Sequence, residues 1–198
     1  YQKFKRVVQT ISYMPHFIST VIVAGIIIDF FSSTGAIAEI IAKLGGPTGN
    51  LLGMPRYFRT IFITSGIWQG LGFGSIIYIA SLSKIDPELY EAADIDGAGR
   101  LKKAIYITLP SIAPTIIIML ILRIGNLLTV NSEKILLLYS PTTYSVADVI
   151  GTFVYRKGLV EYNYGYSTAV GLFNSIVNFT LLIVANFFSK KFSETSLF

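Results

Sequence analysis

Four polar or amphipathic side chains lie inside long apolar stretches of this sequence, where each of them needs a partner. Trp68 and Gln69 are adjacent, among glycines. An indole beside an amide suits a sugar ring, whose apolar face stacks while its hydroxyls form hydrogen bonds. Arg123 lies in another apolar stretch, and Asn126 follows three residues later on a similar helical face. We predict that these four residues line a pathway for a polar solute, with packing of Trp68 and ion pairing of Arg123 as structural alternatives.

The composition argues against catalysis by this chain. His16 is the only histidine and there is no cysteine, so a nucleophile, a base or a set of metal ligands is hard to assemble. We expect no catalytic residue, no metal site and no cofactor bound by the chain itself. The net charge is +5, but the basic residues are scattered at the ends of apolar runs and form no continuous patch. They suit lipid headgroups better than nucleic acid.

Four apolar stretches are long enough to cross a membrane. The sequence is 53% hydrophobic with a mean hydropathy of +0.63, which is too apolar for a soluble domain of 198 residues. A helix of about 20 mostly apolar residues spans a hydrocarbon core of about 30 Å. We therefore predict an all-α integral membrane protein, a single transmembrane domain over residues 1–198. The predicted spans lie at about 11–31, 59–82, 111–130 and 166–188.

The segment between the second and third predicted spans, residues 83–109, is polar. Asp86 is suited to cap a helix and Pro87 to occupy its first position, so we predict a short helix that runs to about Asp94. Gly97 then permits a sharp turn before a second helix. The first helix is acidic, whereas a helix that lies on a membrane surface carries basic residues on its polar face. The segment is therefore predicted to dock on a protein.

A motif with fixed spacing occupies the same segment. Glu91-Ala92-Ala93 is followed after three residues by Gly97, after nine more by Ile107, and after one more by Leu109-Pro110. This pattern resembles the EAA loop of the membrane permease subunits of binding-protein-dependent ATP-binding-cassette (ABC) importers. The resemblance implies a cytoplasmic coupling helix that rests in a groove of an ATPase subunit. It assigns ATPase coupling to Leu89, Tyr90, Glu91, Ala92, Ala93, Asp94 and Gly97.

Shorter motifs extend the resemblance over the whole chain. Residues 13–19 (YMPHFIS), 147–150 (ADVI) and 169–173 (AVGLF) look like the LplB-type branch of polysaccharide and oligosaccharide permeases. The resemblance implies a type I importer fold of six spans, so we expect two spans to precede this chain. It also implies four kinds of partner in a bacterial plasma membrane: a homologous second permease, two ABC ATPase subunits that bind ATP and Mg, an extracellular solute-binding protein, and membrane lipid.

The resulting hypothesis is a transport subunit, not an enzyme, that moves an oligosaccharide or a polysaccharide fragment across the plasma membrane. Importers of amino acids, phosphate or peptides share the EAA loop and remain an alternative. A membrane-embedded enzyme would need the reactive residues that the composition lacks. A passive channel or a scaffold would leave the acidic, glycine-containing loop unexplained.

The basic residues also predict the orientation. Residues 1–10, 83–109 and 189–198 together hold nine Lys and Arg residues. Residues 32–58 and 131–165, together with Arg59 at the start of the second span, hold six. The positive-inside rule places the first set in the cytoplasm, in agreement with a loop that meets an ATPase. The segment 131–165 is then extracellular. Its aromatic cluster (Tyr155, Tyr162 and Tyr164, with Tyr166 at the next span) fits an interfacial belt or a sugar-stacking surface, of which the belt is favoured.

Overall fold

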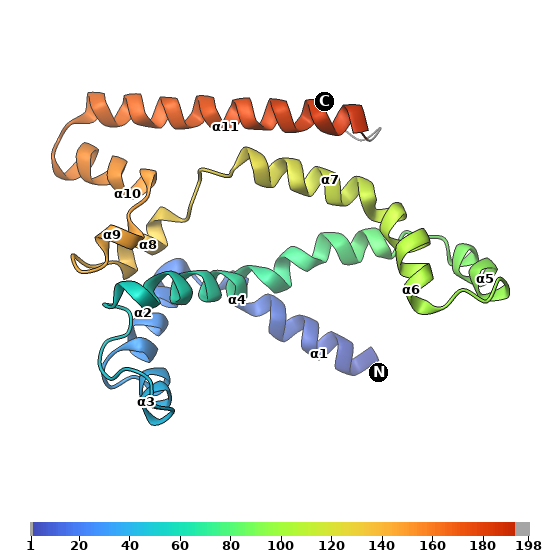
Figure 1. Ribbon diagram of the computed structural model, residues 1–198, viewed down its shortest axis with the longest axis horizontal. Coiled ribbons are helices and arrows are strands. Elements are labelled where there is room, and N and C mark those ends of the chain that lie inside the picture. The colour runs from blue at the N-terminus through green and yellow to red at the C-terminus, as the bar shows by residue number, and fades with distance from the viewer. Residues whose placement is uncertain (1, 193–198) are drawn as a thin grey trace. The chain divides into compact units, whose positions relative to one another are not determined.

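The computed structural model describes residues 2–192, which form helices joined by turns and loops and contain no strand (Figure 1). The α-helices are α1 (Gln2–Tyr13), α2 (Thr20–Phe31), α3 (Ala36–Lys43), α4 (Pro55–Leu82), α5 (Pro87–Ile95), α6 (Arg100–Lys103), α7 (Leu109–Gly125), α8 (Ser132–Leu138), α9 (Tyr144–Ala147), α10 (Ile150–Tyr155) and α11 (Tyr164–Phe192). A 3-10 helix, η1 (Met14–Phe17), and two π-helical segments, η2 (Ala104–Thr108) and η3 (Arg156–Val160), complete the described fold.

Among residues 2–192, four helical segments are long and apolar enough to cross a membrane, which confirms the predicted fold class. They are Thr20–Lys43, Pro55–Leu82, Arg100–Gly125 and Tyr164–Lys191. Each overlaps one predicted span, but the bounds differ. The prediction for 11–31 assumed a continuous helix, whereas α1 ends before η1 and α2 starts only after Ser19, whose hydroxyl accepts a hydrogen bond from the Ile22 N–H. Pro15 lies in η1 because it has no N–H to continue α1.

The chain forms two compact units. Unit 1 comprises residues 1–73 and 128–172, and unit 2 comprises residues 74–127 and 173–198, of which the structure describes all but residue 1 and residues 193–198. The helices α4 and α11 are long enough to contribute to both units. The predicted single domain therefore contains two groups of packed helices. The predicted cytoplasmic tail after Lys190 lies mostly outside the described residues.

The core of unit 1 joins segments that are far apart in the sequence. Apolar side chains from α2, α3, the start of α4, α8 and α9 pack together in one cluster. Its buried members are Val23, Ala24, Ile27, Ala38, Leu51, Leu52, Phe58, Ile61, Ile135, Leu138 and Ala147. The segment after residue 131, which we predicted as a loop between two spans, is therefore part of this core.

One glycine of α4 permits a close approach between two helices. A Cβ atom at Gly72 would lie 2.0 Å from the carbonyl oxygen of Ser12 at the end of α1. At Gly66, Gly70 and Gly74 a Cβ atom would meet no described atom within 4 Å. Of these four glycines, only Gly72 is required by the packing of α1 against α4, because any side chain there would collide with backbone.

Candidate functional site

The predicted docking helix is present as α5, one of two short helices between the end of α4 and the start of α7 (Figure 1). The Asp86 side chain accepts a hydrogen bond of 3.0 Å from the Glu88 N–H, and Pro87 occupies the first turn. Proline costs little there because its missing N–H would have no partner in the helix. The local sequence thus sets the start of α5 without help from the rest of the fold.

The end of α5 is closed by a glycine in the left-handed conformation. Gly97 has a φ angle of +71°. Its N–H donates to the Asp94 carbonyl at 3.1 Å, and the Ala98 N–H donates to the Ala93 carbonyl at 2.8 Å. This pair of hydrogen bonds is the Schellman motif, which satisfies two carbonyls at a helix end. The turn predicted at Gly97 therefore ends α5 and redirects the chain into α6.

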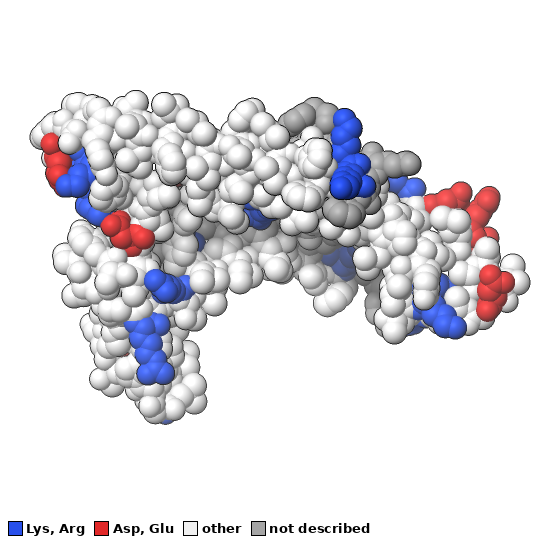
Figure 2. Space-filling view, turned by 45° about the horizontal axis from the view of Figure 1, so that its top comes forward, with Lys and Arg blue, Asp and Glu red and all other residues white. Residues whose placement is uncertain are grey.

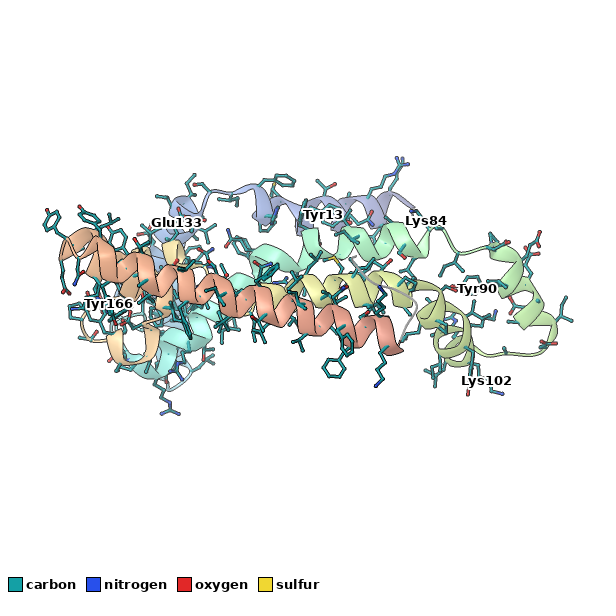
Figure 3. The ribbon with its side chains drawn as sticks, turned by 90° about the horizontal axis from the view of Figure 1, so that it is seen from above. Tyr13, Lys84, Tyr90, Lys102, Glu133 and Tyr166 are labelled. Carbon is teal, nitrogen blue, oxygen red and sulfur yellow. The ribbon has the colours of Figure 1, made fainter. Side chains whose placement is uncertain are left out.

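Two side-chain contacts fasten α5 to the segment that leads into α7. The Tyr90 hydroxyl points toward that segment and lies 2.9 Å from the Thr108 hydroxyl in η2 (Figure 3). Asp94 forms an ion pair with Lys103 at the end of α6. The Asp94 carboxylate is thus engaged within the chain while its side chain stays 67% exposed, and its coupling role stays a prediction. These contacts connect α5 with α6 and with η2, the segment that leads into α7.

The outer face of α5 and α6 is open to solvent. The structure describes all nine residues of α5, and none of them is buried. Figure 2 shows acidic side chains gathered at this end of unit 2, with basic side chains beside them. Ile95 is 88% exposed and Leu101 is 74% exposed. Sequence reasoning missed these two residues, although an isoleucine and a leucine in so polar a segment were a usable signal.

Trp68 and Gln69 lie in unit 1 on different faces of α4, because adjacent residues of an α-helix point about 100° apart. Trp68 is half exposed and borders an apolar hollow of about 570 Å³, lined also by Ile26 and Phe30 of α2. The Gln69 side chain instead accepts a hydrogen bond from Lys134. The two side chains therefore have separate surroundings in the structure, and their role in a solute pathway stays a prediction.

Lys134 is a buried cation that the sequence reasoning did not select. It is 2% exposed, its ammonium lies 3.3 Å from the Gln69 Oε1 atom, and it is 5.7 Å from the centre of the Phe62 ring. None of the ion pairs among the described residues includes Lys134. Burial lowers its pKa, because desolvation disfavours the charged form. Its position directly before the apolar run of α8 was the signal in the sequence.

Arg123 and Asn126 belong to unit 2, with Arg123 in the last turn of α7 and Asn126 directly after the helix. The predicted span 111–130 assumed helix throughout, whereas α7 ends at Gly125. Asn126 caps this end, and its side-chain amide donates to the Leu122 carbonyl at 3.0 Å. Arg123 is exposed, and no ion pair among the described residues includes it. The pathway role of both residues stays a prediction.

A charged cluster in the predicted extracellular segment was also missed. The Arg156 guanidinium donates to both carboxylate oxygens of Asp148, at 2.8 and 2.6 Å, and lies 5.3 Å from the centre of the Tyr144 ring. The fully buried Thr152 hydroxyl donates to the same carboxylate. The hydrogen bonds from Arg156 hold the pKa of Asp148 below its ordinary value. The cluster stabilises the short helices of unit 1.

Comparison with known proteins identifies the family of this chain. Residues 2–194 match the family described as the binding-protein-dependent transport system inner membrane component. The chain is 43% identical over 98% of its length to protein LplB of Bacillus subtilis (strain 168). It is 42% identical over 98% of its length to the polygalacturonan/rhamnogalacturonan transport system permease protein YteP of the same strain. The alignments cover 62% and 61% of these two relatives, so the chain spans somewhat less than two thirds of their length.

A solved structure extends the likeness to three dimensions. A chain of a bacterial alginate ABC transporter, crystallised in complex with an alginate pentasaccharide-bound periplasmic protein, matches with a TM-score of 0.94 and 45% sequence identity. The match covers 99% of this chain and 68% of that one. A second crystal structure, of a transporter for import of the acidic polysaccharide alginate, matches with a TM-score of 0.93.

Proposed function

The chain belongs to the family of inner membrane components of binding-protein-dependent transport systems, and on this premise we propose that it is the permease subunit of an ATP-driven oligosaccharide importer. It crosses the bacterial plasma membrane several times. It catalyses no reaction, because ATP, with Mg, is bound and hydrolysed by partner subunits. The observation that carries the proposal is α5, a capped helix with no buried residue, which the Tyr90 side chain connects to η2.

The geometry supports a mechanism for coupling. An ATPase subunit that closes on ATP would displace α5, and the contacts of Tyr90 with Thr108 and of Asp94 with Lys103 would carry this movement into η2 and α7. Rigid helices that rock together are the usual basis of alternating access. The Schellman turn at Gly97 keeps α5 and α6 at a defined angle. The coupling residues Leu89, Glu91 and Ala92 would contact the ATPase directly.

The partners and substrate class follow from the same premise. A homologous second permease and two ABC ATPase subunits would complete the membrane complex, and an extracellular solute-binding protein would deliver the substrate. We favour oligosaccharides or polysaccharide fragments. Relatives that match nearly the whole chain are named for polygalacturonan and rhamnogalacturonan, or were solved as transporters of alginate. Trp68, Gln69, Arg123 and Asn126 are our candidates for the solute pathway.

The test compares two charge reversals in the reconstituted complex. Glu91→Lys places a cation on the exposed face of α5, where a mismatch with the ATPase groove costs several kcal/mol, so we expect uptake to fall by roughly tenfold or more. Glu39→Lys makes the same change on the exposed face of α3 in unit 1 and should leave uptake unchanged. Both variants should insert and assemble. Normal ATPase stimulation by the loaded binding protein in Glu91→Lys would reject α5 as the coupling helix.

A further inference from the structure

A hollow of about 430 Å³ lies in unit 1 between the α10–η3 segment and the first turns of α11. Its lining includes Val154, Tyr155, Gly158, Tyr164, Ser167 and Thr168. We call it the tyrosine pocket. Its volume is within the range of small-molecule sites, which begins at about 300 Å³. It lies in the segment that charge asymmetry places on the extracellular side, where a delivered solute would arrive.

The tyrosine pocket is held in shape by contacts between its two walls. The Ser167 hydroxyl donates to the Val154 carbonyl at 3.1 Å, so α10 and α11 are hydrogen bonded to each other. A Cβ atom at Gly158 would lie 2.8 Å from the Ser167 Oγ atom, and only glycine allows this approach. Ser167 is 8% exposed, whereas Tyr155 and Tyr164 are 43% and 56% exposed. The pocket therefore has a fixed floor and an open aromatic rim.

The lining of the pocket suits a sugar ring that is recognised through its C–H face and its hydroxyls, not through a carboxylate. The two cations next to it are already paired, Arg156 with Asp148 and Lys157 with Glu161, so they leave no unpaired positive charge for an anionic ligand. Tyrosine rings offer faces for the C–H side of a sugar, and the hydroxyls of Thr168 and of the tyrosines can bond its hydroxyls. Resting on the proposed function, we propose that the tyrosine pocket binds one sugar ring of the incoming oligosaccharide.

The competing explanation is that the tyrosines form an interfacial belt. The two explanations differ in which tyrosines they involve. A belt uses every exposed tyrosine at that depth, whereas the tyrosine pocket uses only Tyr155 and Tyr164. Tyr166 is 50% exposed, close to the value for Tyr164, but it packs against Phe153 and does not line the pocket. It stands at the start of α11 (Figure 3). Tyr166 is therefore a matched control for Tyr164.

The first experiment places a fluorescent reporter at each position in the full reconstituted complex. Tyr164→Trp and Tyr166→Trp are titrated with an alginate tetrasaccharide, a galacturonate trisaccharide and neutral maltotetraose. The native Trp68 contributes the same background to both. We expect at least one saccharide to change the emission of Tyr164→Trp in a saturable way and to leave Tyr166→Trp unchanged. An equal response at both positions, or none at Tyr164→Trp, would overturn the proposal.

The second experiment measures uptake. Tyr164→Ala should raise the KM for saccharide uptake about three- to tenfold at an unchanged maximal rate, as expected for the loss of one stacking contact. Tyr164→Phe, which keeps the stacking ring, should return the KM most of the way to the wild-type value, and Tyr166→Ala should behave as wild type. Equal losses in both alanine variants would identify a belt and overturn the pocket. A wild-type complex that takes up no saccharide would overturn both this inference and the proposed function. Normal wild-type uptake with no effect of Tyr164→Ala would overturn the inference alone.

Discussion

Two segments between the spans predicted from the sequence are built from short helices, yet they differ in burial. Residues 83–109 form α5, α6 and η2, in which the structure describes every residue and finds none buried. Residues 131–160 form α8, α9, α10 and η3, which contribute Lys134, Ile135, Leu138, Ala147, Thr152 and Gly158 to the buried interior. The first segment, which is richer in charged residues, stays exposed in this chain, whereas the second completes the core of unit 1.

The contacts within each segment agree with this difference. In residues 83–109 a Schellman turn, one hydroxyl pair and one ion pair hold an otherwise exposed arrangement in place. In residues 131–160 an apolar cluster and the hydrogen-bonded Asp148–Arg156 pair are combined. Changes in the first segment should alter coupling with little loss of stability, and changes in the second should unfold unit 1.

The largest expected effect on stability is that of Ile135→Ala in the second segment, and Ile95→Ala makes the same substitution in the first segment. Ile135 is 2% exposed and Ile95 is 88% exposed. Ile135→Ala leaves a cavity in the core and should lower the free energy of unfolding by about 2 to 5 kcal/mol. Ile95→Ala should change it by less than about 0.5 kcal/mol but weaken ATPase binding. Denaturation in detergent and ATPase co-purification measure the two effects, and equal destabilisation would remove the distinction between the segments.

A smaller effect is expected for Asp148→Asn, which leaves Arg156 without its carboxylate. The loss should be roughly 1 to 2 kcal/mol, since the pair is partly open to solvent. The pKa of Asp148 is lowered in the folded protein, so the stabilisation is present above the ordinary carboxyl pKa of about 4 and disappears as the pH falls through the lowered folded value. Melting curves between pH 7 and pH 3 should therefore converge for wild type and variant, and a constant difference would contradict the assignment.

Gly97→Ala tests whether the turn after α5 depends on its left-handed conformation. Alanine at a φ of +71° should cost about 1 kcal/mol, which would raise hydrogen exchange of the Ala98 amide about fivefold. Gly99→Ala is the control, because Gly99 has a φ of −69° and open space around its Cα. Similar exchange in the two variants would show that the Schellman turn contributes nothing to the closure of α5.

The smallest expected effect is that of Tyr90→Phe, which removes only the hydroxyl that contacts Thr108. The loss of one partly buried hydrogen bond should weaken the attachment of α5 to η2 by about 0.5 to 1.5 kcal/mol. The exposed Tyr106 provides the control Tyr106→Phe, since its side chain is 76% exposed. Exchange of the α5 amides should rise in the first variant and stay at the wild-type level in the second.

The sequence alone was sufficient for the features that depend on a few consecutive residues. Hydropathy identified the four spans, because a lipid-facing helix must be apolar along its whole length. Asp86 and Pro87 predicted the start of α5, and Gly97 predicted its turn, because capping groups act on the adjacent backbone. The spacing of the EAA motif indicated the family, which the match over residues 2–194 shows.

Only the tertiary structure decided the features that join distant residues. The Lys134 ammonium donates to Gln69, which is 65 residues away in the sequence, and Gly72 packs against the backbone of Ser12. Hydropathy does not predict which helices will be neighbours. The end of α7 at Gly125 was also unpredictable, because the apolar residues that follow continue the hydropathy signal past the last helical turn. Residues 131–160 were predicted to connect two spans because their apolar runs are too short to cross a membrane. They become core only where α2 and α4 supply the opposite surface.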